Sequence, residues 1–171
     1  MRTLLLPAVL LLVAAGCHRG GGAPAAAPAP PPAWTPVAGL SQLYYDNSGG
    51  ISDSVRVVIR DAPALQRIWT QAVSKQTAPP PAPTVDFARD MLLVVGAGRQ
   101  TPDDRIVVDS AGVRRPPPGI AGEPTLTVFT RLVEGCHRFQ ADAYPVSIVR
   151  VPRFAGPVRF VEQREKPANC T

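Results

Sequence analysis

The sequence predicts a mainly β, α+β domain: an antiparallel sandwich or a partly closed barrel, with one amphipathic helix packed on it. Short stretches rich in valine, isoleucine and leucine are separated by proline and glycine, which is typical of strands joined by turns. Only one segment has clear helical periodicity, and no repeat of fixed period is present. Many strands with a single helix favour a β-rich fold with one core.

Residues 40–60 have the pattern of a β-hairpin with a turn at 47–50. In the second arm, apolar and polar residues largely alternate, and Val55, Val57 and Ile59 share one side. A period of two residues indicates a strand with one buried face.

The helix is predicted directly after this hairpin. Asp61 is a suitable N-cap, and Pro63 falls in the first turn, where its missing N–H costs nothing. Apolar residues then recur at helical spacing, at Leu65, Ile68, Trp69, Ala72 and Val73. We expect Trp69 to be a core residue; the alternative is an exposed platform for a ligand.

Strands are predicted for most of the remaining chain. Prolines exclude a strand interior at 77–83, and the continuous apolar run at 91–95 predicts a central strand. A turn at 110–112 is expected to separate two strands. The further strands are expected at 105–109, 112–115, 125–134, 146–151 and 158–163, with Leu126, Val128, Thr130 and Leu132 sharing a face.

The first residues resemble the signal segment of bacterial lipoproteins. A basic Arg2 precedes an apolar run at 4–15, which is shorter than the ~20 residues of a membrane-spanning helix. The run ends in Val13-Ala14-Ala15-Gly16-Cys17, which resembles a lipobox. The resemblance implies a signal peptide at 1–16 and a lipidated Cys17. The alternative is an ordinary signal peptide in which Cys17 is incidental.

Residues 17–38 are predicted to be a tether because they are rich in proline, alanine and glycine, and residues 39–171 are predicted to be a single domain. In lipoproteins of many Gram-negative bacteria, an acidic residue after the lipidated cysteine retains the protein in the inner membrane. His18 stands at that position here. We therefore expect a lipid-anchored protein of the cell envelope, in the outer membrane and facing the periplasm or the exterior.

Three cysteines are present, and lipidation of Cys17 would leave Cys136 and Cys170 in an oxidising compartment. We expect these two to form a disulfide bond that closes a loop of roughly 34 residues. The alternative makes Cys136 a nucleophile beside His137. Neighbouring residues on a strand point to opposite faces, which disfavours that alternative.

Composition argues against several functional classes. The net charge of +5 comes from single arginines, without the basic stripe and aromatic platforms of nucleic-acid-binding proteins. No G-x-S-x-G motif is present, and Cys136, His137 and Cys170 supply at most three zinc ligands. The carboxylates of Asp103, Asp104 and Asp109 are candidate ligands for a calcium ion. The alternative is that they belong to a solvated turn. We therefore predict no catalytic residue, no metal site and no cofactor.

Two features are candidates for interaction surfaces. Residues 114–119 form a basic, proline-rich segment that is suited to docking in a groove, the alternative being a stiff loop. The edges of a small sheet offer a second route, because a partner strand can add to them by main-chain hydrogen bonds.

The order of elements resembles the C-terminal domain family of PrcB, named for a subunit of a protease complex. The resemblance spans residues 55–162 and is carried by Ile68-Trp69, the segment Val85–Val95, and Tyr144-Pro145-Val146 followed by Val149–Pro152. Residues 101–105 replace the family's T-G-G-Y-like turn. The resemblance implies a module that binds or stabilises a partner protein, such as a protease, and that is not a catalyst.

The predicted function is therefore a lipid-anchored, protein-binding module of the cell envelope. One alternative is a small-ligand or polysaccharide binder, for which an exposed aromatic cluster of Tyr44, Tyr45 or Tyr144 is expected. A less favoured alternative is an envelope enzyme, for which titratable groups should gather in a pocket near His137.

Overall fold

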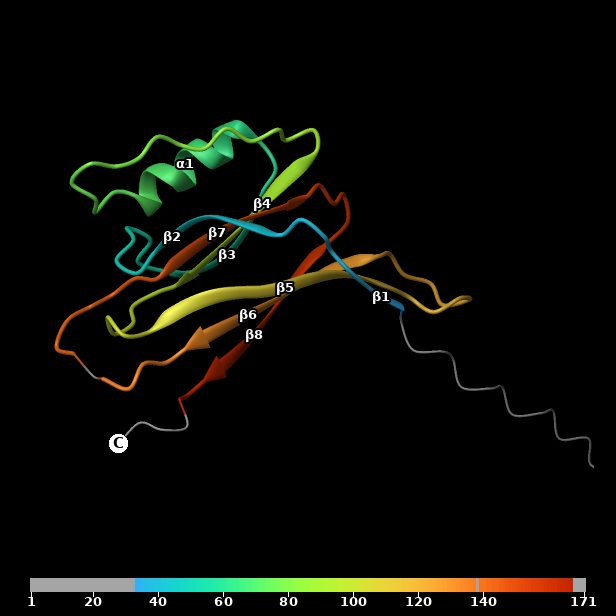
Figure 1. The fold of residues 1–171 in the computed structure, drawn as a ribbon. Helices are drawn as coiled ribbons and strands as arrows, with labels where there is room; N and C mark the ends of the chain where they lie inside the picture. Colours follow the sequence, from blue (N-terminus) through green and yellow to red (C-terminus); the bar gives the residue numbers. More distant parts are fainter. Residues whose placement is uncertain (1–32, 138, 168–171) are drawn as a thin grey trace, which may run out of the picture.

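The computed structural model describes residues 33–137 and 139–167, which form a β-sandwich of two four-stranded sheets with one helix on its outside (Figure 1). Sheet A has the strand order β1-β5-β6-β8, and sheet B has the order β2-β7-β4-β3. The predicted fold class is confirmed in its sandwich form. The elements are β1 (Ala33–Pro36), β2 (Ser41–Asp46), β3 (Ser54–Ile59), α1 (Ala62–Ala72), β4 (Asp90–Ala97), β5 (Arg105–Arg115), β6 (Thr125–Val133), β7 (Val146–Pro152) and β8 (Val158–Glu165).

Strand β4 is buried on both of its faces. Met91, Leu93 and Val95 belong to the core between the two sheets, whereas Leu92 and Val94 belong to a second core between sheet B and α1. All five residues have 0% exposure. This explains why the sequence of β4 is a continuous apolar run instead of an alternating one. The prediction of a central strand is confirmed.

Helix α1 covers the outer face of sheet B (Figure 1). Asp61 is its N-cap, because its carboxylate accepts the Ala64 N–H at 2.7 Å. The predicted apolar stripe faces the sheet, and Trp69 is only 5% exposed. The Trp69 indole N–H also donates to the Pro80 carbonyl at 2.9 Å, which fastens the proline-rich loop onto the helix. No helix in the described part of the chain is long and apolar enough to span a membrane.

The predicted hairpin at 40–60 is wrong. Strands β2 and β3 lie at opposite edges of sheet B, and both β7 and β4 lie between them. β2 pairs with β7, and β3 pairs with β4. The two central strands are the most apolar in sequence, so they occupy the doubly covered middle and displace the less apolar strands to the edges.

The turn-like sequence at 47–50 contains glycines for reasons of packing. A Cβ atom at Gly50 would lie 2.1 Å from the Gln71 carbonyl oxygen, and one at Gly49 would lie 2.5 Å from a methyl carbon of Val146. The Gly50 N–H donates to the Ala72 carbonyl at 3.0 Å. The two glycines therefore let this loop pass tightly against the end of α1 instead of reversing the chain.

The turn predicted at 110–112 is also wrong, because β5 is one continuous strand. Its register against β6 shifts between Val108 and Ser110, which marks a β-bulge. The residue without a partner in this register is Asp109, and the small residues at 110–112 continue the strand beyond it. The shared face of Leu126, Val128, Thr130 and Leu132 on β6 is confirmed, since all four are buried. β6 and β8 pair in parallel, whereas every other strand pair is antiparallel within the described residues.

The folded domain extends further toward the N-terminus than the predicted boundary at residue 39. Residues 33–36, placed in the tether by composition, form β1 and pair with the end of β5. The Trp34 ring covers Gly112, where a Cβ atom would lie 2.2 Å from the indole. This close fit between a large ring and a glycine anchors a strand that proline and alanine alone would not predict.

Because Trp69 is buried between α1 and sheet B, Trp69→Ala should destabilise the protein by about 3 to 5 kcal/mol. Trp69→Phe retains most of the apolar volume but removes the hydrogen bond to Pro80. It should therefore lower the free energy of unfolding by about 1 to 3 kcal/mol. Urea denaturation followed by circular dichroism measures both. A loss below about 1 kcal/mol for Trp69→Ala would contradict the core assignment.

Candidate functional site

The residues that the sequence singled out fall into two groups. Cys17 and Cys170 lie outside the described residues, so lipidation and the disulfide pairing stay predictions. Cys136 and His137 lie in an exposed loop that follows β6, at one end of the sandwich. Within this loop, the structure brings His137 and Gly135 against the turn at 101–104.

Asp103 holds His137 by two contacts. The His137 backbone N–H donates to Asp103 Oδ2 at 3.1 Å, and His137 Nδ1 lies 3.0 Å from the same oxygen. These interactions, the backbone N–H first, hold the pKa of the Asp103 carboxyl below its usual range. Gly135 permits the close approach, because a Cβ atom there would lie 2.2 Å from Asp103.

Asp104 is the buried member of this turn, with 2% exposure. Its carboxylate accepts the Gly135 N–H at 2.8 Å and the Thr101 N–H at 3.1 Å. It therefore ties the loop after β6 to the turn before β5 and satisfies two backbone donors. These contacts identify the turn as a structural junction between two loops.

The calcium alternative required Asp103, Asp104 and Asp109 to gather around one point. Asp109 instead binds Arg131 with two hydrogen bonds, at 2.6 and 2.8 Å. Arg131 also pairs with Glu165. The described residues contain no group of three or more histidine, cysteine, aspartate or glutamate side chains placed to hold a metal ion.

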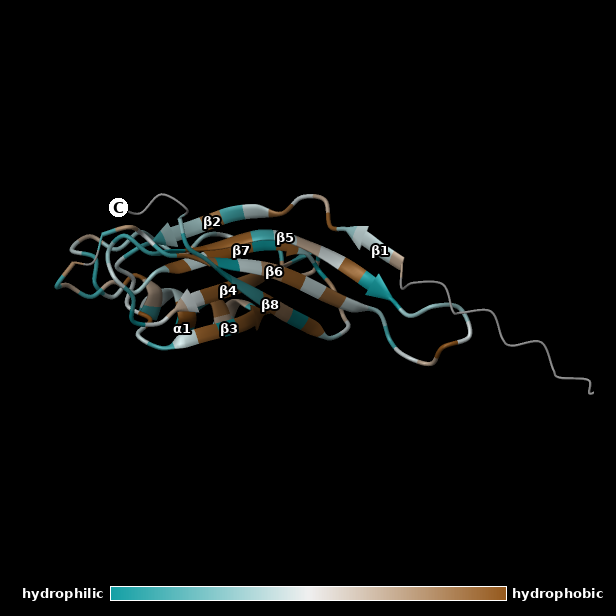
Figure 2. Ribbon diagram, turned by 90° about the horizontal axis from the view of Figure 1, so that it is seen from below, coloured by the Kyte–Doolittle hydropathy of each residue, from teal (hydrophilic) through white to brown (hydrophobic). Residues whose placement is uncertain are grey.

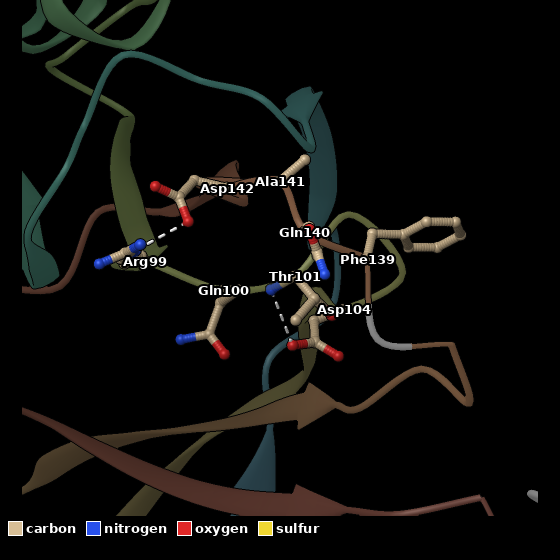
Figure 3. Close-up of a pocket in the computed structure, with 8 residues that line it drawn as sticks. All are labelled: Arg99, Gln100, Thr101, Asp104, Phe139, Gln140, Ala141 and Asp142. Carbon is tan, nitrogen blue, oxygen red and sulfur yellow. Dashed lines mark hydrogen bonds and ion pairs between the residues drawn. The ribbon is translucent and has the colours of Figure 1, made fainter.

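A polar cavity of about 660 Å³ lies beside this junction (Figure 3). On one side, Arg99 and Asp142 point toward one another and form an ion pair at 2.8 Å. Asp104 lies across from them, bound to the Thr101 N–H, and the Phe139 ring turns away from the other labelled side chains. The charged groups of this cavity are thus engaged with each other or with the backbone, and His137 is not among its lining residues.

The three tyrosines of the polysaccharide alternative do not present a common aromatic surface. The Tyr44 ring packs on Trp69 at 4.9 Å between centroids, and its hydroxyl donates to Asp46. Tyr45 is exposed, whereas the Lys75 ammonium lies 3.6 Å above the Tyr144 ring. Each of the other two rings is therefore covered by a partner that composition did not reveal.

The outer face of sheet A carries the aromatic surface that the sequence reasoning missed. Trp34 and Phe129 meet edge to face, with centroids 5.6 Å apart, and Trp34 remains 39% exposed. Within residues 33–137 and 139–167, no helix packs on this face, in contrast to sheet B (Figure 1). The one available signal was a tryptophan within a segment of alanine and proline, which is unusual for a tether.

Among the strands that the structure describes, the last strand of sheet A also has one edge without a partner. β8 pairs with β6 on one side only, and it is the outermost of the four strands. At this side of the sandwich, Arg56 of β3 and Glu162 of β8 form an ion pair that links the edges of the two sheets.

Comparisons with known proteins do not extend these observations. A scan of protein-family models, a search of curated proteins and a search of solved structures each find no match for this chain. The resemblance to the PrcB C-terminal domain family rests on the sequence residues alone.

Asp104 provides a direct test of the junction. Asp104→Ala would leave the partly buried N–H groups of Thr101 and Gly135 without this acceptor, so the free energy of unfolding should fall by about 2 to 4 kcal/mol. The control is Asp53→Ala, an exposed aspartate, which should change it by no more than about 0.5 kcal/mol. Equal effects of the two variants in urea denaturation would refute the structural role of Asp104.

The predicted disulfide can be tested independently. β8 ends at Glu165, which lies opposite Val133 of β6, and the Glu134 N–H donates to the Glu165 carbonyl at 2.9 Å. The described end of the chain therefore leaves the sheet near the loop that holds Cys136, which favours a bridge.

We expect no free thiol in the mature protein when it is denatured without reductant. Cys136→Ala and Cys170→Ala should each destabilise by about 3 to 4 kcal/mol, and the double variant should lose no more than either single variant. A reactive thiol at Cys136 near neutral pH would instead support the nucleophile alternative.

Proposed function

We propose that this protein is a lipid-anchored, protein-binding module of the cell envelope, and that it binds its partner through sheet A. The observation that carries the proposal is the asymmetry of the sandwich. Sheet B is covered by α1, whereas the outer face of sheet A carries the exposed Trp34 beside Phe129 and ends in the unpaired edge of β8. Aromatic residues on an uncovered face are typical of interface centres.

The sequence supports the location and the class of partner. The lipobox-like segment ending at Cys17 and the tether behind it favour a membrane-anchored domain outside the cytoplasm. The resemblance to the PrcB C-terminal domain family favours a partner protein, and a protease that the module stabilises or assists is the candidate. A binding module also agrees with the paired charges at the loop end, where Arg99, Asp103 and Asp104 already have structural partners.

Site-specific photocrosslinking in the intact, membrane-anchored protein tests this proposal. A photoreactive phenylalanine analogue at Gln163, exposed on β8, should give a discrete crosslinked protein. The same analogue at Gln66, exposed on α1, is the matched control and should give none. Crosslinks from Gln66 alone, or none from either position under conditions that crosslink a known pair, would contradict binding through sheet A.

The anchor is tested in the same cells. Cys17→Ser should abolish lipid labelling and release the protein from the membrane fraction. Unchanged labelling would refute the lipid anchor. The binding face would still be tested by the crosslinks.

A further inference from the structure

The outer face of sheet A contains a groove at the end where β5 runs into its loop toward β6. Its volume is about 500 Å³. Phe129 of β6 and Val161 of β8 contribute apolar surface, and three arginines line it, namely Arg114 and Arg115 at the end of β5 and Arg159 near the start of β8. Figure 2, seen from below, shows the hydrophilic end of β5 beside this loop.

The positive charge of this groove is not neutralised within the described part of the protein. No ion pair there involves Arg114, Arg115 or Arg159, and Glu123 is the one acidic lining residue. Arginine stays protonated in proteins, so the groove keeps its charge at any physiological pH.

Arg131, on the same face, shows the opposite arrangement. It binds both Asp109 and Glu165, and these contacts raise the pKa of its guanidinium. Sheet A thus pairs Arg131 with two carboxylates, whereas the three arginines of the groove have no carboxylate partner among the described residues, and Arg115 donates only to the Thr35 hydroxyl at 3.3 Å. A ligand that supplies carboxylates would complement them with charge-assisted hydrogen bonds.

We propose that this groove binds an acidic, extended polypeptide segment of the partner protein, with Trp34 and Phe129 as apolar contacts. The inference rests on the proposed function and names the chemistry of the partner. A concave surface with apolar residues at Phe129 and Val161 fits alternating acidic and apolar side chains, whereas a planar bilayer surface would not reach into it. Tryptophan and arginine are also the residues most enriched at the energetic centres of protein interfaces.

The proline-rich segment at 114–119 acquires a different role in this arrangement. The sequence left two interpretations of it, a stiff loop and a segment that docks into a groove of another protein. Its arginines and Pro116 instead form one wall of a groove on this protein. Arg114 and Arg115 are held by β5, and after Pro116 the chain turns, with the Ile120 N–H donating to the Pro117 carbonyl at 3.1 Å. The wall is therefore formed without a ligand, which lowers the entropic cost of binding.

The test uses the full-length protein in detergent and two fluorescent octapeptides, one alternating glutamate with valine and the other alternating lysine with valine. We expect saturable binding of the glutamate peptide in fluorescence anisotropy, weakened by added salt, and no saturable binding of the lysine peptide. The variant R114E/R159E should bind the glutamate peptide at least tenfold more weakly.

The control variant R67E/R89E has the same net charge. Arg67 and Arg89 are exposed, and neither lines the groove. It should bind the glutamate peptide within about twofold of the unmodified protein. R114K/R159K, which preserves the charge, should bind the glutamate peptide more tightly than R114E/R159E does. Thermal unfolding should show that all variants fold.

Several results would overturn the inference: equal losses in R114E/R159E and R67E/R89E, no loss in either, or equal binding of both peptides. Binding only to phosphatidylglycerol vesicles or only to polygalacturonate would assign the groove to a membrane or to an anionic polysaccharide instead. If Gln163 still crosslinks to a protein in the R114E/R159E background, the proposed function stands and the groove is not its binding site.

Discussion

The burial of β4 on both faces is the constraint on which the rest of the structure depends. Its five apolar residues at 91–95 alternate between two cores, and each fully buried aliphatic side chain contributes roughly 1.5 to 3 kcal/mol. A strand of this kind requires a cover on each side. Sheet A supplies one cover and α1 supplies the other, so the molecule has three layers.

This layering determines which surface is free. Sheet A covers β4 with its inner face, and nothing in the described chain covers its outer face in turn. An exposed tryptophan such as Trp34, which packs on the partly buried Phe129 of that outer face, therefore needs a different explanation. A binding role supplies one, because burying the Trp34 ring against a partner would recover the free energy that its exposure costs.

The sequence predicted the individual helices and strands better than it predicted which strands lie side by side. Periodicity identified β4, α1 and the buried face of β6, because each pattern reports which side of one element is apolar. It failed for the hairpin, since the placement of β2 and β3 depends on competition with β4 and β7 for the centre of the sheet. It also failed for β1 and for the bulge in β5, because Gly112 and its neighbours resemble a turn until the Trp34 ring is seen above them.

The contacts of the charged residues distinguish structural from functional roles better than their positions in the sequence do. The conspicuous groups, Asp103, Asp104 and His137, lie together at the loop end, but their contacts hold two loops against each other. The arginines of the groove come from strands that are distant in the chain, and their convergence depends on the parallel pairing of β8 with β6. That pairing brings Arg159 onto the face that ends in Arg114, and no local pattern encodes it. The functional hypothesis thus rests on arginines that the sheet topology brings together without ion-pair partners. The charged groups of the loops, which have partners, stabilise the fold instead.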